Sequence, residues 1–156
     1  GFLPPRTVMP AFAGVCPGGT ATITAHAVGT GPFSYKWRKD GQDIAASENP
    51  SALKPTLELP GASGATVGQY DCVILNDCGT HVTDAVPFIL CVADLNCDGA
   101  VDDTDFTIFL VQYNILDCAD PSMPAGCSCD FNADGIVEDT DFQLFLPAYN
   151  RFACGE

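Results

Sequence analysis

The chain is poor in positive charge and has no long apolar run. Among 156 residues, Lys and Arg together number 6 against 20 Asp and Glu, which gives a formal net charge of −14. Nucleic acids and anionic membranes bind basic surfaces, so this composition excludes both as partners. The longest apolar run, residues 85–93, is interrupted by Pro87 and is far shorter than the roughly 20 residues that span a bilayer.

Catalytic motifs are also scarce. The only two histidines, His26 and His81, lie in strand-like segments, and neither stands beside a serine or cysteine pattern typical of a nucleophile. The sequence contains no phosphate-binding loop and no dinucleotide fingerprint. We therefore expect a protein that is not an enzyme.

The chain does contain a duplicated acidic loop. Residues 94–105 and 130–141 each place oxygen donors at positions 1, 3, 5, 9 and 12, with glycine at position 6. This is the spacing of an EF-hand-like calcium loop, in which glycine permits a sharp turn and position 7 binds through its backbone carbonyl. The predicted ligands of two Ca²⁺ ions are Asp94, Asn96, Asp98, Ala100, Asp102 and Asp105 in the first loop, and Asp130, Asn132, Asp134, Ile136, Glu138 and Asp141 in the second.

The two copies, 36 residues apart (94 to 130), remain alike after the loops. An apolar stripe at i, i+3, i+4 and i+7 predicts a helix after each loop, with this face in a small core. Because Pro147 replaces Val111, we expect the second helix to kink or stop early. The stripe consists of Phe106, Phe109, Leu110 and Tyr113 in the first copy, and of Phe142, Phe145, Leu146 and Tyr149 in the second.

Negative charge is concentrated in the same half of the chain. Residues 93–156 hold 13 acidic groups and one basic group, Arg151, whereas residues 1–92 hold 7 acidic and 5 basic groups. The four carboxylates at the ligand positions of each loop repel one another at close range until a divalent cation intervenes. We therefore expect the folding of this half to depend on calcium.

The acidic half resembles a family of secreted bacterial modules. Residues 85–92 are strand-like where an ordinary EF-hand has an entering helix, and both twelfth loop positions are aspartate. Together with the loop–helix duplication, these features make residues 91–154 similar to a dockerin-like module. The resemblance implies two calcium-binding loop–helix units related by pseudo-twofold symmetry and, for many members, docking onto a cohesin domain. Asp103 and Asp139 stand at loop position 10, where cellulosomal dockerins commonly carry serine.

The first ninety residues consist of short β-prone runs separated by turn signals, which predicts a β-sandwich. Trp37, and Tyr70 placed two residues before Cys72, make residues 5–91 resemble an immunoglobulin-like domain. The resemblance implies a core tryptophan and a tyrosine corner, in which the Tyr70 hydroxyl bonds to nearby backbone. Ala25 stands where such domains carry the strand-B cysteine, so the usual inter-sheet disulfide is expected to be missing. The predicted strands cover residues 20–28, 33–39, 56–59, 69–75 and 80–90, with Phe33, Tyr35 and Trp37 in the core.

Nine cysteines indicate an oxidising compartment and the use of disulfides. Since nine is odd, at least one thiol is free or paired with another chain. Two pairing schemes remain open at this point. The repeat favours Cys91–Cys118, Cys127–Cys154 and Cys97–Cys129, and a rival scheme joins Cys16 to Cys91.

These patterns together predict two domains. Residues 1–90 form a mainly β immunoglobulin-like sandwich with an N-terminal extension, and residues 91–156 form a small α-helical dockerin-like module with two calcium loops. We expect a secreted, extracellular or cell-surface protein. The favoured function is a calcium-binding, non-catalytic structural or interaction protein whose copies join into a fibre or surface layer, with Ca²⁺ rigidifying each subunit. The alternatives are a dockerin-type adaptor that binds a cohesin-like protein, and a carbohydrate-binding sandwich.

Three features favour assembly from copies of this chain. One is the odd number of cysteines. Another is the only basic cluster, Lys36, Arg38 and Lys39, whose charge is opposite to that of the acidic half. The third is the apolar, proline-bearing segment 1–12, which is expected to add along the sheet edge of a neighbouring subunit.

Overall fold

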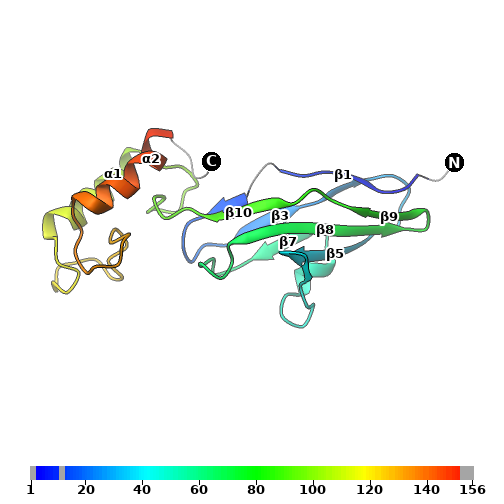
Figure 1. Cartoon of the computed structure of the whole chain (residues 1–156), viewed down its shortest axis with the longest axis horizontal. Helices are drawn as coiled ribbons and strands as arrows, with labels where there is room; N and C mark the ends of the chain where they lie inside the picture. Colours follow the sequence, from blue (N-terminus) through cyan, green and yellow to red (C-terminus); the bar gives the residue numbers. More distant parts are fainter. Residues whose placement is uncertain (1–2, 11–12, 152–156) are drawn as a thin grey trace. The chain divides into compact units, whose positions relative to one another are not determined.

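The computed structural model describes residues 3–10 and 13–151 of the chain, which separate into two compact units. The first unit comprises Gly1–Gly14 and Gly18–Leu90, and the second comprises Val15–Pro17 and Cys91–Glu156. Figure 1 shows the strands of the β-sandwich in blue to green and the two helices of the second unit in yellow-green and orange-red.

The larger sheet has the strand order β2-β10-β8-β5-β6. The long strand β8 pairs with β5 on one side, and on the other side it pairs with β10 at residues 68–70 and with β9 at residues 73–76. The sequence predicted β5, β8, β9 and β10 but not the short strands β2 and β6. The strands of this sheet are β2 (Ala13–Val15), β5 (Ser34–Lys39), β6 (Gln42–Asp43), β8 (Gly68–Asn76), β9 (Gly79–Val82) and β10 (Val86–Leu90).

The opposite side of the sandwich consists of two strand pairs. Antiparallel pairs form between β3 (Ala21–Thr24) and β7 (Thr56–Leu59), and between β1 (Arg6–Val8) and β4 (His26–Val28). Only Ala25 separates β3 from β4, and its N–H donates to the carbonyl of Pro55 at 2.9 Å. This bond continues the β3–β7 register by one residue, and after Ala25 the chain pairs with β1 instead, so the predicted run 20–28 forms two strands.

The edge of β7 that does not pair with β3 is covered by a short 3₁₀ helix, η1 (Pro50–Leu53). The Asn49 side-chain amide donates to the carbonyl of Glu58 at 2.8 Å, and the N–H of Glu58 donates to the Ser51 hydroxyl at 2.9 Å. Both backbone groups of Glu58 are thus occupied by side chains. An uncapped strand edge is a template for pairing with another chain, so this arrangement protects the edge.

The sandwich core contains the two aromatic residues that the sequence singled out. Trp37 is fully buried, and its indole N–H donates to the carbonyl of Lys54 at 2.8 Å. The Tyr70 hydroxyl donates to the carbonyl of Thr66 at 2.7 Å, which confirms the tyrosine corner. Burial raises the pKa of Tyr70 to about 12. Phe33 and Tyr35 are only partly buried, so of the three expected core aromatics only Trp37 is fully enclosed.

Each loop of the second unit is followed by a helix, as predicted: α1 (Asp103–Ile115) and α2 (Asp139–Arg151). Helix α1 starts with a capping box, in which Asp102 accepts from the N–H of Thr104 and Asp105 accepts from the N–H of Asp102. Helix α2 does not stop early at Pro147, because it is as long as α1; the kink, the other expected effect of this proline, stays a prediction. Pro147 and Gln143 are both exposed, so water can reach the carbonyl that the proline leaves without a partner.

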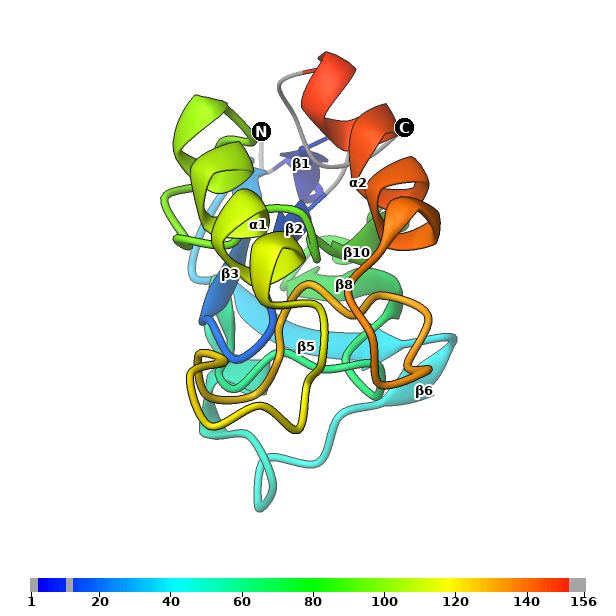
Figure 2. The same ribbon diagram turned by 90° about the vertical axis from the view of Figure 1, so that its left-hand side faces the viewer.

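The two helices pack through their phenylalanines. Phe109 and Phe145 are almost fully buried, and their ring centroids lie 5.3 Å apart. Phe106 and Phe142 contact each other at 6.0 Å. Leu110 is 39% exposed, so the buried face is narrower than the predicted stripe. Figure 2 shows the two helices and the yellow and orange chain that connects them.

The disulfides differ from both predicted schemes. Cys16 pairs with Cys97, and Cys118 pairs with Cys127, with Cα–Cα distances of 5.4 and 5.5 Å. The expected pairs Cys91–Cys118, Cys127–Cys154, Cys97–Cys129 and Cys16–Cys91 are therefore wrong, because each includes a cysteine that is bonded elsewhere; Cys154 itself lies outside the described residues.

The predicted pairs failed because the cysteines do not pair according to their positions in the sequence repeat. Val15–Pro17 belongs to the second unit, which brings Cys16 to the first loop, and Cys118–Cys127 closes the chain between α1 and the second loop. Cys91 is also disulfide-bonded. Free thiols remain on Cys72 and Cys129, which are buried, and on Cys78, which is exposed.

Candidate functional site

The first candidate site is the loop from Asp94 to Asp105. Asp94 is buried, and its two carboxylate oxygens accept from the N–H groups of Asp98 at 3.1 Å and Gly99 at 3.0 Å. Asn96 accepts from the N–H of Asp98 at 3.0 Å, and Asp98 accepts from the N–H of Ala100 at 2.9 Å. The side chains at positions 1, 3 and 5 thus fold the loop back on itself. Burial raises the pKa of the Asp94 carboxyl.

The second loop repeats this hydrogen-bond pattern atom by atom. Asp130 accepts from the N–H groups of Asp134 at 3.1 Å and Gly135 at 2.8 Å. Asn132 accepts from the N–H of Asp134, and Asp134 accepts from the N–H of Ile136, both at 3.0 Å. The two loops therefore share one local structure and not only one sequence spacing.

The backbone of the two loops is matched as well. Position 4 has a φ of 61° in both copies, at Cys97 and Ala133, and position 6 has a φ of 90°, at Gly99 and Gly135. The left-handed conformation at position 6 is the reason that glycine occupies it twice. The sequence predicted this turn at glycine but gave no signal for the left-handed residues at position 4.

The aspartates at position 12 are fully buried and close the loops. One oxygen of Asp105 accepts from the N–H groups of Leu95 at 2.7 Å and Asn96 at 3.1 Å, and the other accepts from the N–H of Asp102 at 2.9 Å. Asp141 makes the three equivalent bonds in the second loop. Each of these carboxylates therefore ties the start of its loop to the start of the following helix.

Positions 7 and 9 differ between the copies. At position 9, Asp102 caps α1, whereas Glu138 accepts a hydrogen bond from the Thr140 hydroxyl at 3.1 Å. At position 7, Ile136 forms an isolated β-bridge with Asp117, and Ala100 offers the equivalent carbonyl in the first loop. The second loop is thereby joined to the chain that leaves α1.

The donor set of both loops fits a hard cation, although the side chains are engaged with the backbone. Over residues 3–10 and 13–151, no group of three or more His, Cys, Asp or Glu side chains is arranged so as to hold a metal ion. The carboxylates at positions 1 and 5 instead accept backbone N–H groups of their own loops. All the donors are oxygens, the ligands that Ca²⁺ prefers, and most of these oxygens accept one amide and keep a second lone pair.

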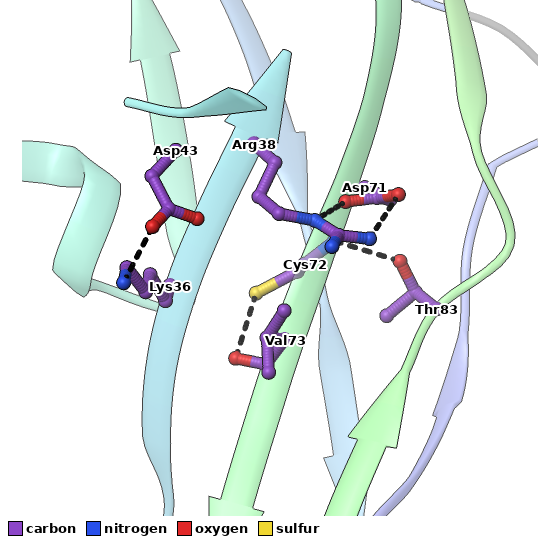
Figure 3. A network of polar contacts seen from close by, with 7 residues as sticks. All are labelled: Lys36, Arg38, Asp43, Asp71, Cys72, Val73 and Thr83. Atoms are coloured by element: carbon purple, nitrogen blue, oxygen red, sulfur yellow. Dashed lines mark hydrogen bonds and ion pairs between the residues drawn. The ribbon is translucent and has the colours of Figure 1, made fainter. Parts of the chain in front are cut away.

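The basic cluster is not an open charged surface. Lys36 forms a salt bridge of 2.6 Å with Asp43, and Arg38 binds both oxygens of Asp71 at 2.7 and 2.8 Å (Figure 3). Lys39 donates to a backbone carbonyl. Acidic partners within the same sheet thus engage Lys36 and Arg38, and attraction of the cluster to the acidic half of a second copy stays a prediction.

The N-terminal segment is paired within its own chain. Arg6–Val8 forms the β1–β4 ladder, and the N–H of Leu3 donates to the Thr30 hydroxyl at 3.0 Å. The Asn76 side-chain amide also donates to the carbonyl of Leu3 at 2.7 Å. Contacts within the chain therefore hold the described part of the segment, and its addition to a neighbouring sheet stays a prediction; residues 1–2 and 11–12 lie outside the described residues.

Sequence reasoning missed two sets of contacts in the second unit. Gln112 is buried and binds the N–H of Cys129 at 3.0 Å and the Ser128 hydroxyl at 2.9 Å. The sequence did offer one signal for this contact: Gln112 is polar where the second copy has alanine, Ala148. The second set joins the copies: the Tyr113 hydroxyl donates to Asp139 at 2.6 Å, and the Tyr149 hydroxyl donates to Asp103 at 2.5 Å.

A two-sheet sandwich with a buried tryptophan and a tyrosine corner defines the first unit as an immunoglobulin-like domain. The chain belongs to the immunoglobulin I-set family, whose model matches residues 7–86. Domains of this family typically mediate extracellular protein–protein contacts and are typically non-catalytic.

Solved immunoglobulin structures share this fold. The tandem Ig repeats of Dlar are 26% identical with a TM-score of 0.50, over 56% of this chain and 48% of that one. Extracellular domains 3–5 of Drosophila OTK match at 20% identity and a TM-score of 0.50, over 57% of this chain and 32% of that one. A Dscam structure, solved to explain isoform specificity, matches at 20% identity and a TM-score of 0.51, over 58% of this chain and 25% of that one. This chain thus spans about half or less of these chains.

The family match ends before the first loop, so the second unit is interpreted from its own geometry. Within the described ranges, neither helix is long and apolar enough to cross a membrane.

Proposed function

We propose that this protein is a non-catalytic extracellular interaction protein, in which an I-set domain precedes a dockerin-like unit that binds two calcium ions. The observation that carries the proposal is the atom-by-atom repetition of the two loops. The donors at positions 1, 3 and 5 accept the same amide hydrogens in both copies, and both loops turn through a left-handed glycine. Each loop thus gathers the same oxygen donors around one turn, which is the donor type that Ca²⁺ prefers.

Charge gives a second reason. Residues 93–156 carry a net charge of −12, and two Ca²⁺ ions add four positive charges at the places where carboxylates are closest in sequence. The ions relieve the repulsion between these carboxylates and bind only the folded loops, so they stabilise the second unit. We expect the unit to be rigid with calcium and loosened by a chelator.

Calorimetric titration with Ca²⁺ tests this proposal directly. The wild-type chain is expected to bind two ions, and Asp98→Ala or Asp134→Ala to bind one each, since each removes the position-5 donor of one loop. The double variant is expected to bind none. Asp120→Ala, which removes an exposed carboxylate of the same unit outside both loops, serves as the charge-matched control. If the wild type binds no calcium, or if Asp120→Ala loses as much binding as Asp98→Ala, the metal proposal fails.

The proposed partners are further copies of this chain, joined into a fibre or surface layer. Exposed apolar side chains on both helices support this: Leu110 and Val111 on α1 and Leu144 on α2 are 39%, 49% and 52% exposed. The exposed thiol of Cys78 offers a further link between subunits. Sedimentation velocity with calcium and with chelator, together with electron microscopy, is the test. Monomers alone at every concentration would contradict assembly.

The alternative is a dockerin-type adaptor that binds a cohesin-like receptor. The same exposed helix faces support it, and they lie on the elements that follow the calcium loops. Capture of a distinct receptor from the secreted proteins of the source organism, in calcium but not in chelator, would favour docking. Capture of this chain alone would favour self-assembly.

A further inference from the structure

The two tyrosine–aspartate bonds of the second unit are reciprocal. Tyr113, near the end of α1, binds Asp139, the first residue of α2. Tyr149, near the end of α2, binds Asp103, the first residue of α1. The end of each helix therefore holds the start of the other, and the two helices run antiparallel.

Each bond is made to a residue near the C-terminal end of a predicted calcium loop. Asp103 directly follows Asp102, and Asp139 directly follows Glu138, the position-9 donors of the two loops. A shift of the end of either loop therefore displaces the helix that follows the other loop. Hydrogen bonding to the adjacent carboxylate raises the pKa of both tyrosines, so both hydroxyls keep their protons at neutral pH.

A second link runs along the backbone. After α1 ends, the N–H of Cys118 donates to the carbonyl of Gly135 at 3.0 Å, and the N–H of Val137 donates to the carbonyl of Leu116 at 2.7 Å. These bonds flank Ile136, the position-7 donor of the second loop. The first loop–helix copy thus contacts the second loop at two places.

We propose that Tyr113 and Tyr149 couple the two calcium loops, so that filling one loop raises the affinity of the other. The proposal rests on the proposed calcium binding and adds to it the residues that transmit the effect. When a cation orders one loop, the helix that follows is fixed, and the reciprocal bonds hold the start of the other helix in place. The second ion then meets a loop that is already ordered, which is positive cooperativity.

Calcium titration of the whole chain tests the coupling. The wild type is expected to bind two ions with a Hill coefficient above one, up to the limit of two set by the number of sites. Tyr113→Phe with Tyr149→Phe is expected to bind two ions with a Hill coefficient near one, and with about fivefold more calcium needed for half saturation. Phenylalanine keeps the ring contacts of Tyr113 with Phe109 and of Tyr149 with Phe106, so the core is retained.

A double-mutant cycle provides the matched control. Tyr113→Phe combined with Asp139→Ala removes the same bond twice, so the pair is expected to need no more calcium than Asp139→Ala alone. Tyr113→Phe combined with Asp103→Ala breaks both reciprocal bonds, so its effects are expected to add. Tyr35→Phe, in the sandwich, should change nothing. Circular dichroism of each variant checks that the helices remain folded.

The outcomes separate this inference from the metal proposal. Two bound ions with a Hill coefficient of one in the wild type, or the same behaviour of the matched and mismatched pairs, would overturn the coupling and leave calcium binding intact. A wild type that binds no calcium would overturn both.

Discussion

The cap on β7 gives the sharpest test of the sandwich. The Asn49 side chain accepts from the N–H of Ser51 at 3.1 Å and from the Ser51 hydroxyl at 2.6 Å, and it donates to the carbonyl of Glu58 at 2.8 Å. Asn49→Ala removes all three bonds. Loss of a helix cap costs about 1 kcal/mol, and loss of the bond to Glu58 costs about 1 kcal/mol more. We therefore expect the free energy of unfolding to fall by about 2 kcal/mol.

The assay follows from the position of Trp37, the only tryptophan in the sequence. Because Trp37 is buried in the first unit, its fluorescence in a urea titration reports the unfolding of the sandwich and not that of the helices. With a urea dependence of about 2 kcal/mol per M, the midpoint should fall by about 1 M. Loss of the cap also uncovers the edge of β7, so light scattering should rise near the midpoint.

Two further variants separate the parts of this effect. Asn49→Asp keeps the oxygen that binds Ser51 but replaces the donor to Glu58, so it should lose part of the stability. Asn114→Ala changes an exposed residue of α1 and should leave the Trp37 transition where it is. A midpoint for Asn49→Ala that corresponds to a change below about 0.5 kcal/mol, the range of ordinary surface substitutions, would refute the reasoning.

Three predictions concern the thiols. Ala25→Cys should form the missing inter-sheet disulfide with Cys72. Because this bond closes a 47-residue span, it should raise the free energy of unfolding by up to about 4 kcal/mol in non-reducing buffer. A Cys72 thiol that still reacts with a thiol reagent in the unfolded, non-reduced variant would count against it. At pH 8 a thiol reagent should modify Cys78 at once but Cys72 and Cys129 only after unfolding, and similar rates for all three would contradict their burial. Burial raises the pKa of Cys72 and Cys129 from 9.0 to about 11, so the unfolded chain loses these protons first. Stability should therefore fall from pH 9 to 11, and less steeply in Cys72→Ala.

Local patterns predicted the sandwich well where one rule applied along a whole strand. The segment at residues 56–59 alternates in burial along its length, and β7 covers the predicted residues. The predicted run 80–90 is two strands, because the regular ladder ends at Thr83: the N–H of Cys72 donates to the Thr83 hydroxyl at 2.9 Å (Figure 3). The N–H of Thr83 still donates to the carbonyl of Cys72 at 3.0 Å. The short strands β1, β2 and β6 carry too few residues for a pattern.

In the second unit, too, local patterns were predicted correctly and long-range contacts were not. The helices and their shared core follow from Phe109 and Phe145, whose spacing is local. The disulfides depend on the path of the whole chain, and nothing in the sequence near Cys16 indicates that it lies beside Cys97. The proposed ligands are spaced by local rules, whereas the bonds of Tyr113 and Tyr149 join residues 26 and 46 positions apart. Such contacts become visible only when both helices are placed.

The bond between Cys16 and Cys97 has a practical consequence for anyone who wishes to isolate the acidic half. A piece that starts at Cys91 leaves out Val15–Pro17 and leaves Cys97 as an unpaired, reactive thiol within the first loop. Protease nicking between Leu90 and Cys91 would not release two products until a reductant is added, since residues 81 positions apart stay covalently joined. A gel run with and without dithiothreitol after such a cut would display this linkage directly.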